Sequence, residues 1–106
     1  MAESNAHRWA KYRSAGFGGR VEVLLPSGRR LDALSRNRVW GTEVEKSGTF
    51  ARLRLAVERL LESGVPQKVL KVPAADMRLA AAVLRRMGVS AWVRNLDGSR
   101  EFFVRI

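Results

Sequence analysis

The sequence predicts an α/β (α+β) domain in which helices pack on a mixed β-sheet, with the element order α-β-β-β-α-β-α-β-β. Three observations predict this fold. Short apolar segments separated by turn signals fill the first half of the chain. Helix-period apolar patterns then alternate with strands, and an Asp-Gly pair near the C-terminus joins two last strands. We expect residues 1–106 to form one domain, because this length supports one hydrophobic core but not two.

The first helix is predicted over residues 3–14, where apolar and basic positions lie on different sides. We expect Trp9 to anchor this helix in the core and His7 to be solvated. Three strands joined by short polar turns follow, so they should form an antiparallel meander. These strands are expected at residues 20–25, 30–35 and 39–46.

The second half of the chain should add two helices and three strands. Ser47 or Thr49 has the chemistry to cap the first of these helices, and Gly64 to end it. On that helix Arg59 is expected to point outward. The helices are predicted over residues 50–63 and 76–87, and the strands over residues 67–72, 91–94 and 101–106.

The composition is that of a strongly basic globular protein, with 46% hydrophobic residues and a net charge of +10. Polyanions are therefore the expected partners, nucleic acid first and an anionic membrane surface second. Cysteine is absent and His7 is the only histidine, which excludes disulfides and a zinc site built from histidines. No apolar run could span a membrane, so we expect a cytoplasmic protein with no membrane partner.

Three carboxylates are expected to gather on the second and third strands. Glu43 and Glu45 are two residues apart on one strand and share a face, and a hairpin register can bring Asp32 onto it. Crowded like charges repel unless a cation or a proton lies among them. A hard divalent cation, Mg²⁺ or Mn²⁺, held by Asp32, Glu43 and Glu45 is the economical explanation. The alternative is a solvated sheet face that carries acidic residues.

The element order and the residues Asp32 and Glu43-Val44-Glu45-Lys46 resemble the PD-(D/E)XK nuclease family, which has the restriction-endonuclease-like fold. The resemblance covers residues 3–73, and residues 74–106 add a C-terminal helix and hairpin. It implies that Asp32 and Glu43 hold one or two metal ions, Mg²⁺ or Mn²⁺. Glu45 stands where the family usually has lysine.

The resemblance also implies roles in catalysis for Asp32, Glu43, Glu45 and Lys46. Lys46 points to the other face of a regular strand, and a bulge would be needed to bring it round. Gln67 at the start of the next strand is expected to support the ligands by a hydrogen bond. Glu22 either approaches Asp32 across the strand pair or lies exposed.

Basic side chains are expected to form a rim around the meander that follows the phosphates of a nucleic acid. The alternative is that these residues only solvate the surface. The expected rim consists of Arg8, Lys11, Arg13, Arg20, Arg29, Arg30, Arg36, Arg38 and Arg52.

Several functions are compatible with these features. The first is a metal-dependent nuclease that hydrolyses phosphodiester bonds in DNA or RNA, including a tRNA-cleaving toxin domain. The second is a non-catalytic nucleic-acid-binding module on a degenerate nuclease fold. A third is a subunit that binds an acidic protein, such as an inhibitor or immunity protein. A homodimer built on Trp92, Phe102 or Phe103 is also open, although these aromatic residues are expected in the core.

Overall fold

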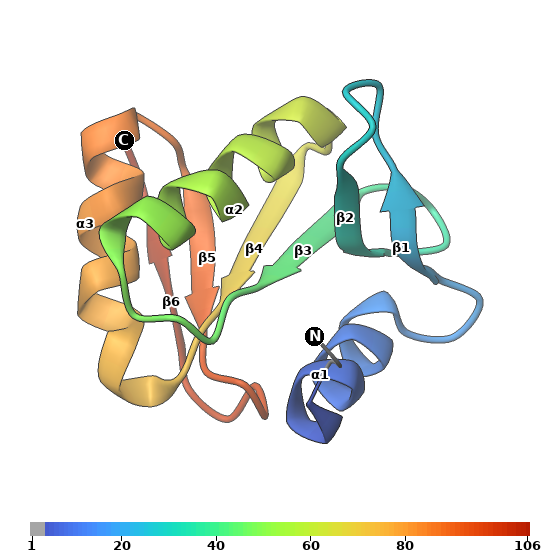
Figure 1. Cartoon of the computed structure of the whole chain (residues 1–106), viewed down its shortest axis with the longest axis horizontal. Helices are drawn as coiled ribbons and strands as arrows, with labels where there is room; N and C mark the ends of the chain where they lie inside the picture. Colours follow the sequence, from blue (N-terminus) through green and yellow to red (C-terminus); the bar gives the residue numbers. More distant parts are fainter. Residues whose placement is uncertain (1–3) are drawn as a thin grey trace.

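A six-stranded mixed sheet forms the centre of the protein in the computed structural model, which describes residues 4–106 (Figure 1). The predicted order of helices and strands is confirmed, with one short 3₁₀ turn, η1, added before the last helix. The helices are α1 (Asn5–Ala15), α2 (Phe50–Ser63) and α3 (Met77–Met87), and η1 covers Ala74–Asp76. The strands are β1 (Arg20–Leu24), β2 (Arg30–Leu34), β3 (Trp40–Val44), β4 (Gln67–Lys71), β5 (Ala91–Arg94) and β6 (Glu101–Val104).

The strands lie in the sheet in the order in which they occur in the chain. β1, β2 and β3 form the predicted antiparallel meander. β4 runs parallel to both β3 and β5, and α2 and α3 are the two crossover connections. β5 and β6 close the sheet as an antiparallel hairpin. Direct turns therefore join the antiparallel strands, and helices join the parallel ones.

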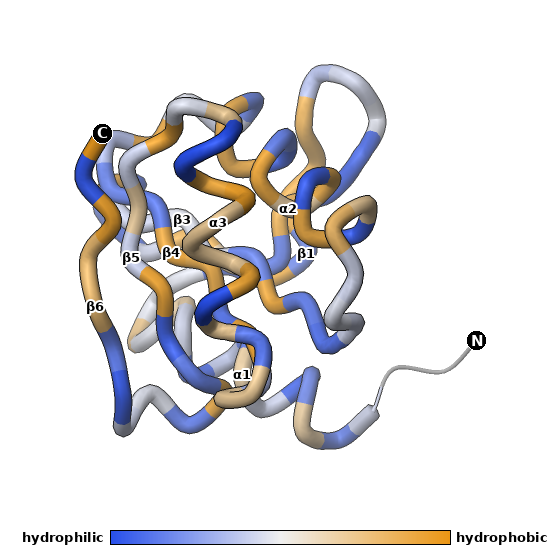
Figure 2. The backbone as a smooth tube through the Cα atoms, turned by 90° about the vertical axis from the view of Figure 1, so that its left-hand side faces the viewer, coloured by the Kyte–Doolittle hydropathy of each residue, from blue (hydrophilic) through white to orange (hydrophobic). Residues whose placement is uncertain are grey.

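The hydrophobic core lies between the sheet and α2 and α3. Leu53, Val57 and Leu60 of α2 are fully buried in it together with Leu70 of β4 and Val93 of β5. Figure 2 shows the apolar positions along α2, α3, β4 and β5 interrupted by hydrophilic ones. On α2 and α3 this alternation buries one side and leaves the other side polar, whereas β4 is buried on both faces at Val69 and Leu70.

The ends of α2 follow the expected capping chemistry. Of the two predicted capping residues, Thr49 is the cap, because its hydroxyl accepts a hydrogen bond from the backbone N–H of Arg52. Gly64 ends the helix in the left-handed conformation at φ 68°, which glycine adopts at little cost.

Helix α1 packs against β1, β2 and β3. Ser4 caps it by accepting from the N–H of His7, and the predicted start at residue 3 lies outside the described residues. The expectation for Trp9 is wrong, because its side chain is 67% exposed. The buried side of α1 consists instead of Ala10, Ala15 and the stem of Lys11. Small residues let the helix approach the strands closely, and this leaves no room for an indole.

Five strands are shorter than predicted, and β3 and β6 are shorter by more than one residue. β3 ends at Val44, where the backbone N–H donates to a carboxylate of β2 rather than to its backbone. β6 ends at Val104, and the N–H of Ile106 then donates to the hydroxyl of Ser90. Within residues 4–106, no helix combines the length and the apolar character needed to cross a membrane.

Candidate functional site

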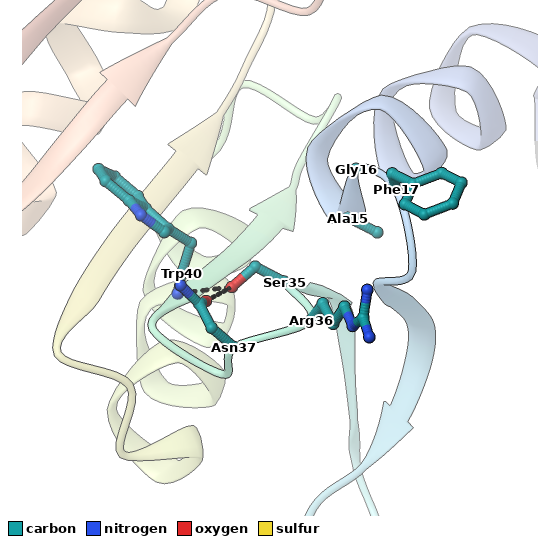
Figure 3. Close-up of a pocket in the computed structure, with 7 residues that line it drawn as sticks. All are labelled: Ala15, Gly16, Phe17, Ser35, Arg36, Asn37 and Trp40. Atoms are coloured by element: carbon teal, nitrogen blue, oxygen red, sulfur yellow. Dashed lines mark hydrogen bonds between the residues drawn. The ribbon is translucent and has the colours of Figure 1, made fainter.

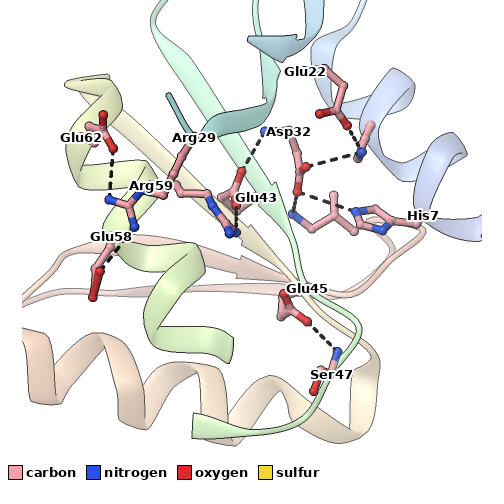
Figure 4. Close-up of polar contacts among 12 residues, drawn as sticks. His7, Glu22, Arg29, Asp32, Glu43, Glu45, Ser47, Glu58, Arg59 and Glu62 are labelled. Atoms are coloured by element: carbon pink, nitrogen blue, oxygen red, sulfur yellow. Dashed lines mark hydrogen bonds and ion pairs between the residues drawn. The ribbon is translucent and has the colours of Figure 1, made fainter. Parts of the chain in front are cut away.

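Asp32 and Glu43 lie together where β2 and β3 begin to separate. The two strands pair at Ala33 with Thr42, and Asp32 and Glu43 are the next residues beyond this pair. At this point the side-chain carboxylates, rather than backbone carbonyls, accept hydrogen bonds from the N–H groups of the neighbouring strand. The Oε2 atom of Glu43 accepts from the N–H of Asp32 at 2.7 Å, and the Oδ2 atom of Asp32 accepts from the N–H of Val44 at 2.8 Å. Each carboxylate is therefore bonded to the backbone of the other strand (Figure 4).

The remaining carboxylate oxygens of this pair face cations from two different helices. The Oδ1 atom of Asp32 lies 3.5 Å from the Nζ atom of Lys11 on α1. The Oε1 atom of Glu43 accepts from the guanidinium of Arg59 on α2 at 3.2 Å. Figure 4 shows α1 and α2 flanking the pair on opposite sides. Each of the four oxygens thus has a donor or a cation supplied by the chain itself.

Burial raises the pKa of both carboxyl groups. Glu43 is only 1% exposed, and its burial, followed by the charge of Asp32, raises its pKa to about 8. The pKa of Asp32 is raised mainly by burial, while the Val44 N–H and the charge of Lys11 act in the opposite direction. At neutral pH, Glu43 therefore holds a proton for much of the time, which lowers the repulsion between the two groups.

Helix α1 brings Lys11 and His7 to Asp32. Lys11 is buried at 4% exposure and also pairs with Glu22 of β1, which links the two carboxylates on the first two strands. The Nε2 atom of His7 lies 3.7 Å from Asp32, and this buried nitrogen has no hydrogen-bond partner within the described residues. His7 is therefore part of the site and not solvated as expected. His7 precedes Lys11 by four residues, about one helical turn, and this spacing is the sequence signal that places both side chains on the same side of α1.

Arg59 also differs from its sequence prediction. It was expected to point away from the protein, but its side chain is 29% exposed and bonds to the buried Glu43. Glu22 does approach Asp32, and its charge helps to raise the pKa of that carboxyl group.

Glu45 and Lys46 do not join the carboxylate pair. Glu45 lies beyond the end of β3, and its carboxylate accepts from the N–H of Ser47 at 2.9 Å (Figure 4). The ammonium of Lys46 donates to the hydroxyl of Ser4, the cap of α1, at 2.9 Å. Among residues 4–106, no three His, Cys, Asp or Glu side chains are grouped to hold a metal ion.

The fit of this site to a divalent cation is poor. The oxygen donors of Asp32 and Glu43 suit Mg²⁺ or Mn²⁺ chemically, but all four oxygens already have partners from the chain. A cation between them would have to displace Lys11 or Arg59, and the third expected ligand, Glu45, lies apart. In this arrangement the chain's own donors and cations occupy the carboxyl oxygens of Asp32 and Glu43.

Gln67 and two residues of the expected basic rim lie in places that give them other roles. Gln67 pairs with Trp40 in the sheet, whereas Glu43 pairs with Leu70, three residues further along β4. Gln67 therefore does not support the carboxylates. Lys11 is buried among carboxylates and is not available to a phosphate. Arg29 bonds to Glu58 and Glu62 of α2.

The other residues of the expected rim are exposed on the meander, on α1 or on α2. They are Arg8, Arg13, Arg20, Arg30, Arg36, Arg38 and Arg52. Arg13 also reaches across to donate to the carbonyl of Asp97 in the β5–β6 loop at 3.2 Å. Arg36 packs its stem against Gly18 and lines a shallow hollow of about 570 Å³ with Phe17 and Trp40 at its two ends (Figure 3).

Comparisons of the chain with protein-family models, with curated proteins and with solved structures each gave no match. The resemblance to the PD-(D/E)XK nucleases therefore remains a prediction from element order and from the short motif around Asp32 and Glu43.

Proposed function

We propose that this protein binds nucleic acid through its basic surface without cutting it. The supporting observation is the separation of charge. The buried carboxyl groups of Asp32 and Glu43 face Lys11 and Arg59, and Lys11 also pairs with the partly exposed Glu22. Most of the arginines of the expected rim are exposed, on a chain of net charge +10. A surface of this kind attracts phosphates, and binding releases their counterions.

A metal-dependent nuclease that acts on DNA or RNA with Mg²⁺ or Mn²⁺ is the second candidate. One observation favours it: Asp32 and Glu43 lie opposite one another on neighbouring strands, as the nuclease resemblance implies. Against it stand the occupied carboxylate oxygens and the separate position of Glu45. A nuclease would need a rearranged site in which Lys11 or Arg59 moves away.

One experiment separates these two functions. Labelled single-stranded and double-stranded DNA and total RNA are incubated with the protein in Mg²⁺, Mn²⁺ or EDTA, and both binding and cleavage are followed. We expect salt-sensitive binding of intact nucleic acid in every condition, unchanged in Asp32→Asn and Glu43→Gln. Metal-dependent cleavage that both variants abolish, while a Glu58→Gln control retains it, would establish the nuclease instead. Absence of any binding at low salt would contradict both.

A further inference from the structure

One face of the sheet carries a row of aromatic residues with an arginine between two of them. The guanidinium carbon of Arg94 lies 5.6 Å from the ring centre of Trp40 and 5.7 Å from that of Trp92. The ring of Phe103 meets Trp92 edge to face, with the ring centres 5.2 Å apart. We call Trp40, Trp92, Phe103 and Arg94 the aromatic row.

Strand pairing places the aromatic row on one face. Trp92 lies beside Phe103 in the β5–β6 hairpin, and Trp40 lies beside Gln67 at the start of β4. Val69 lies two residues after Gln67 on β4 and therefore points to the same face. Because Val69 lies beside Trp92 of β5, Trp92 shares this face with Trp40 of β3. The alternate residues of the same strands, such as Leu70 and Val93, lie in the core against α2 and α3.

Helices leave this face accessible at β5 and β6. α3 packs against these two strands from the core side, whereas α1 packs against β1, β2 and β3. Phe103 remains 40% exposed, and Trp40 and Trp92 are half-buried. A monomer that exposes aromatic rings and a stacked guanidinium together presents surfaces on which the flat faces of nucleic-acid bases can stack.

The same face holds a buried lysine that forms no ion pair within residues 4–106. Lys71 lies beside Arg94 in the sheet and is only 3% exposed. Within the described residues, its ammonium has no ion-pair or hydrogen-bond partner. Arg94 itself shares its charge with Glu101, whose carboxylate accepts from its Nε atom at 3.2 Å. With Arg13 and Asp97 also near Lys71, three cations face two carboxylates, which leaves positive charge that a phosphate would neutralise.

We infer that this face binds single-stranded nucleic acid, with bases stacked on Trp40, Trp92 and Phe103 and the phosphates drawn to Arg94, beside which the buried Lys71 adds positive charge. The inference rests on the proposed function and specifies its ligand class. A single strand fits better than a duplex, because only unpaired bases expose their faces for stacking. Trp40 and Trp92 are two strands apart, about 10 Å, so the row accommodates a short run of bases.

Neighbouring phenylalanines on β6 provide a matched test. Phe103 lies in the aromatic row, whereas Phe102 is paired with Val93 and faces the core side, at a similar exposure of 37%. A labelled oligothymidylate of about 12 nucleotides and its duplex with oligodeoxyadenylate are titrated with wild type, Phe103→Ala and Phe102→Ala. We expect Phe103→Ala to weaken single-strand binding by about fivefold or more and Phe102→Ala to change it less than twofold. Duplex binding should be equal in all three proteins.

Tryptophan fluorescence reports on the row directly. The chain has three tryptophans, and Trp9 lies exposed on α1, outside the aromatic row as defined above. In Trp9→Phe, only Trp40 and Trp92 emit, and we expect the oligothymidylate to quench this emission. Circular dichroism and unfolding curves check that each variant is folded.

The outcomes distinguish this inference from the proposed function. If the oligothymidylate binds but Phe103→Ala and Phe102→Ala have equal effects, or if Trp9→Phe shows no quenching, the site lies elsewhere and only general nucleic-acid binding stands. If neither oligonucleotide binds, the proposed function fails as well. A wild-type dimer that Phe103→Ala dissociates, with no change in oligonucleotide affinity, would show that a second copy of the chain covers this face.

Discussion

Asp32 and Glu43 are held in place by each other's strands: the carboxylate of Glu43 accepts from the N–H of Asp32, and the carboxylate of Asp32 accepts from the N–H of Val44 beside Glu43. This reciprocal arrangement fixes two acidic groups at a point where the sheet ladder opens. Lys11 and Arg59 then supply the compensating charge from α1 and α2. The pair thus joins both helices to the meander and acts as an electrostatic link in the fold.

The raised pKa of Glu43 makes stability depend on pH. Because its pKa rises from 4.5 to about 8 on folding, the folded protein holds a proton that the unfolded chain releases between these values. The free energy of unfolding should therefore fall as pH rises from about 5 to 8, with a limiting slope of about 1.4 kcal/mol per pH unit. Urea unfolding across this range should show a smaller fall in Glu43→Gln. An equally steep fall in that variant would refute the assignment.

Removing Lys11 should destabilise the protein strongly. Lys11→Met leaves Asp32 and Glu22 without their shared cation in a partly buried setting, and loss of one partner of a buried pair costs about 3 kcal/mol. Lys46→Met is the matched control, because Lys46 is exposed and its ammonium donates to the hydroxyl of Ser4. This substitution should change the free energy of unfolding by less than about 0.5 kcal/mol. Equal effects of the two substitutions in chemical unfolding would show that Lys11 has no special role.

Lys71 should reduce stability at neutral pH. Burial and the charges of Arg94 and Arg13 lower its pKa to about 8, so stability should rise as pH increases from about 8 to 10, where the folded protein loses this proton before the unfolded chain does. Lys71→Met should stabilise the protein by about 1–3 kcal/mol at pH 7 and abolish that rise. Lys68→Met, which removes the same charge from a half-buried neighbour bonded to the carbonyl of Val65, is the control. A destabilised Lys71→Met would mean that this ammonium has a favourable partner.

Glu101 should limit binding at the aromatic row, because its carboxylate competes with phosphate for Arg94. Glu101→Gln should tighten binding of the oligothymidylate by about twofold or more at low salt. Glu58→Gln adds the same net charge on α2, away from this face, and should have a smaller effect. Fluorescence anisotropy with both variants measures the difference, and equal gains would point to net charge alone.

The order of elements was predictable because local signals determine it. Pro, Gly and Asp-Gly turns separate the strands, and α2 begins and ends at its cap residues Thr49 and Gly64. The proximity of Asp32 and Glu43 was predictable too, because the short turn between β2 and β3 sets the register of the two strands.

The partners of these carboxylates depend on how the helices dock, which local pattern does not encode. Lys11 and Arg59 occupy positions that, on isolated amphipathic helices, are expected to face solvent, and only the packing of α1 and α2 on the sheet turns them inward. Glu45 was misplaced because β3 ends one residue before it, and its carboxylate then bonds to the N–H of Ser47. Trp9 was misplaced because alanines, not the indole, fill the contact under α1.

The most direct test of nucleic-acid binding is the salt dependence of oligothymidylate affinity, measured by anisotropy in EDTA between about 50 and 200 mM salt. The account predicts a linear fall of the logarithm of the association constant with the logarithm of salt concentration, with a slope of about −2 or steeper. A flat dependence, or no binding at the lowest salt concentration, would contradict it.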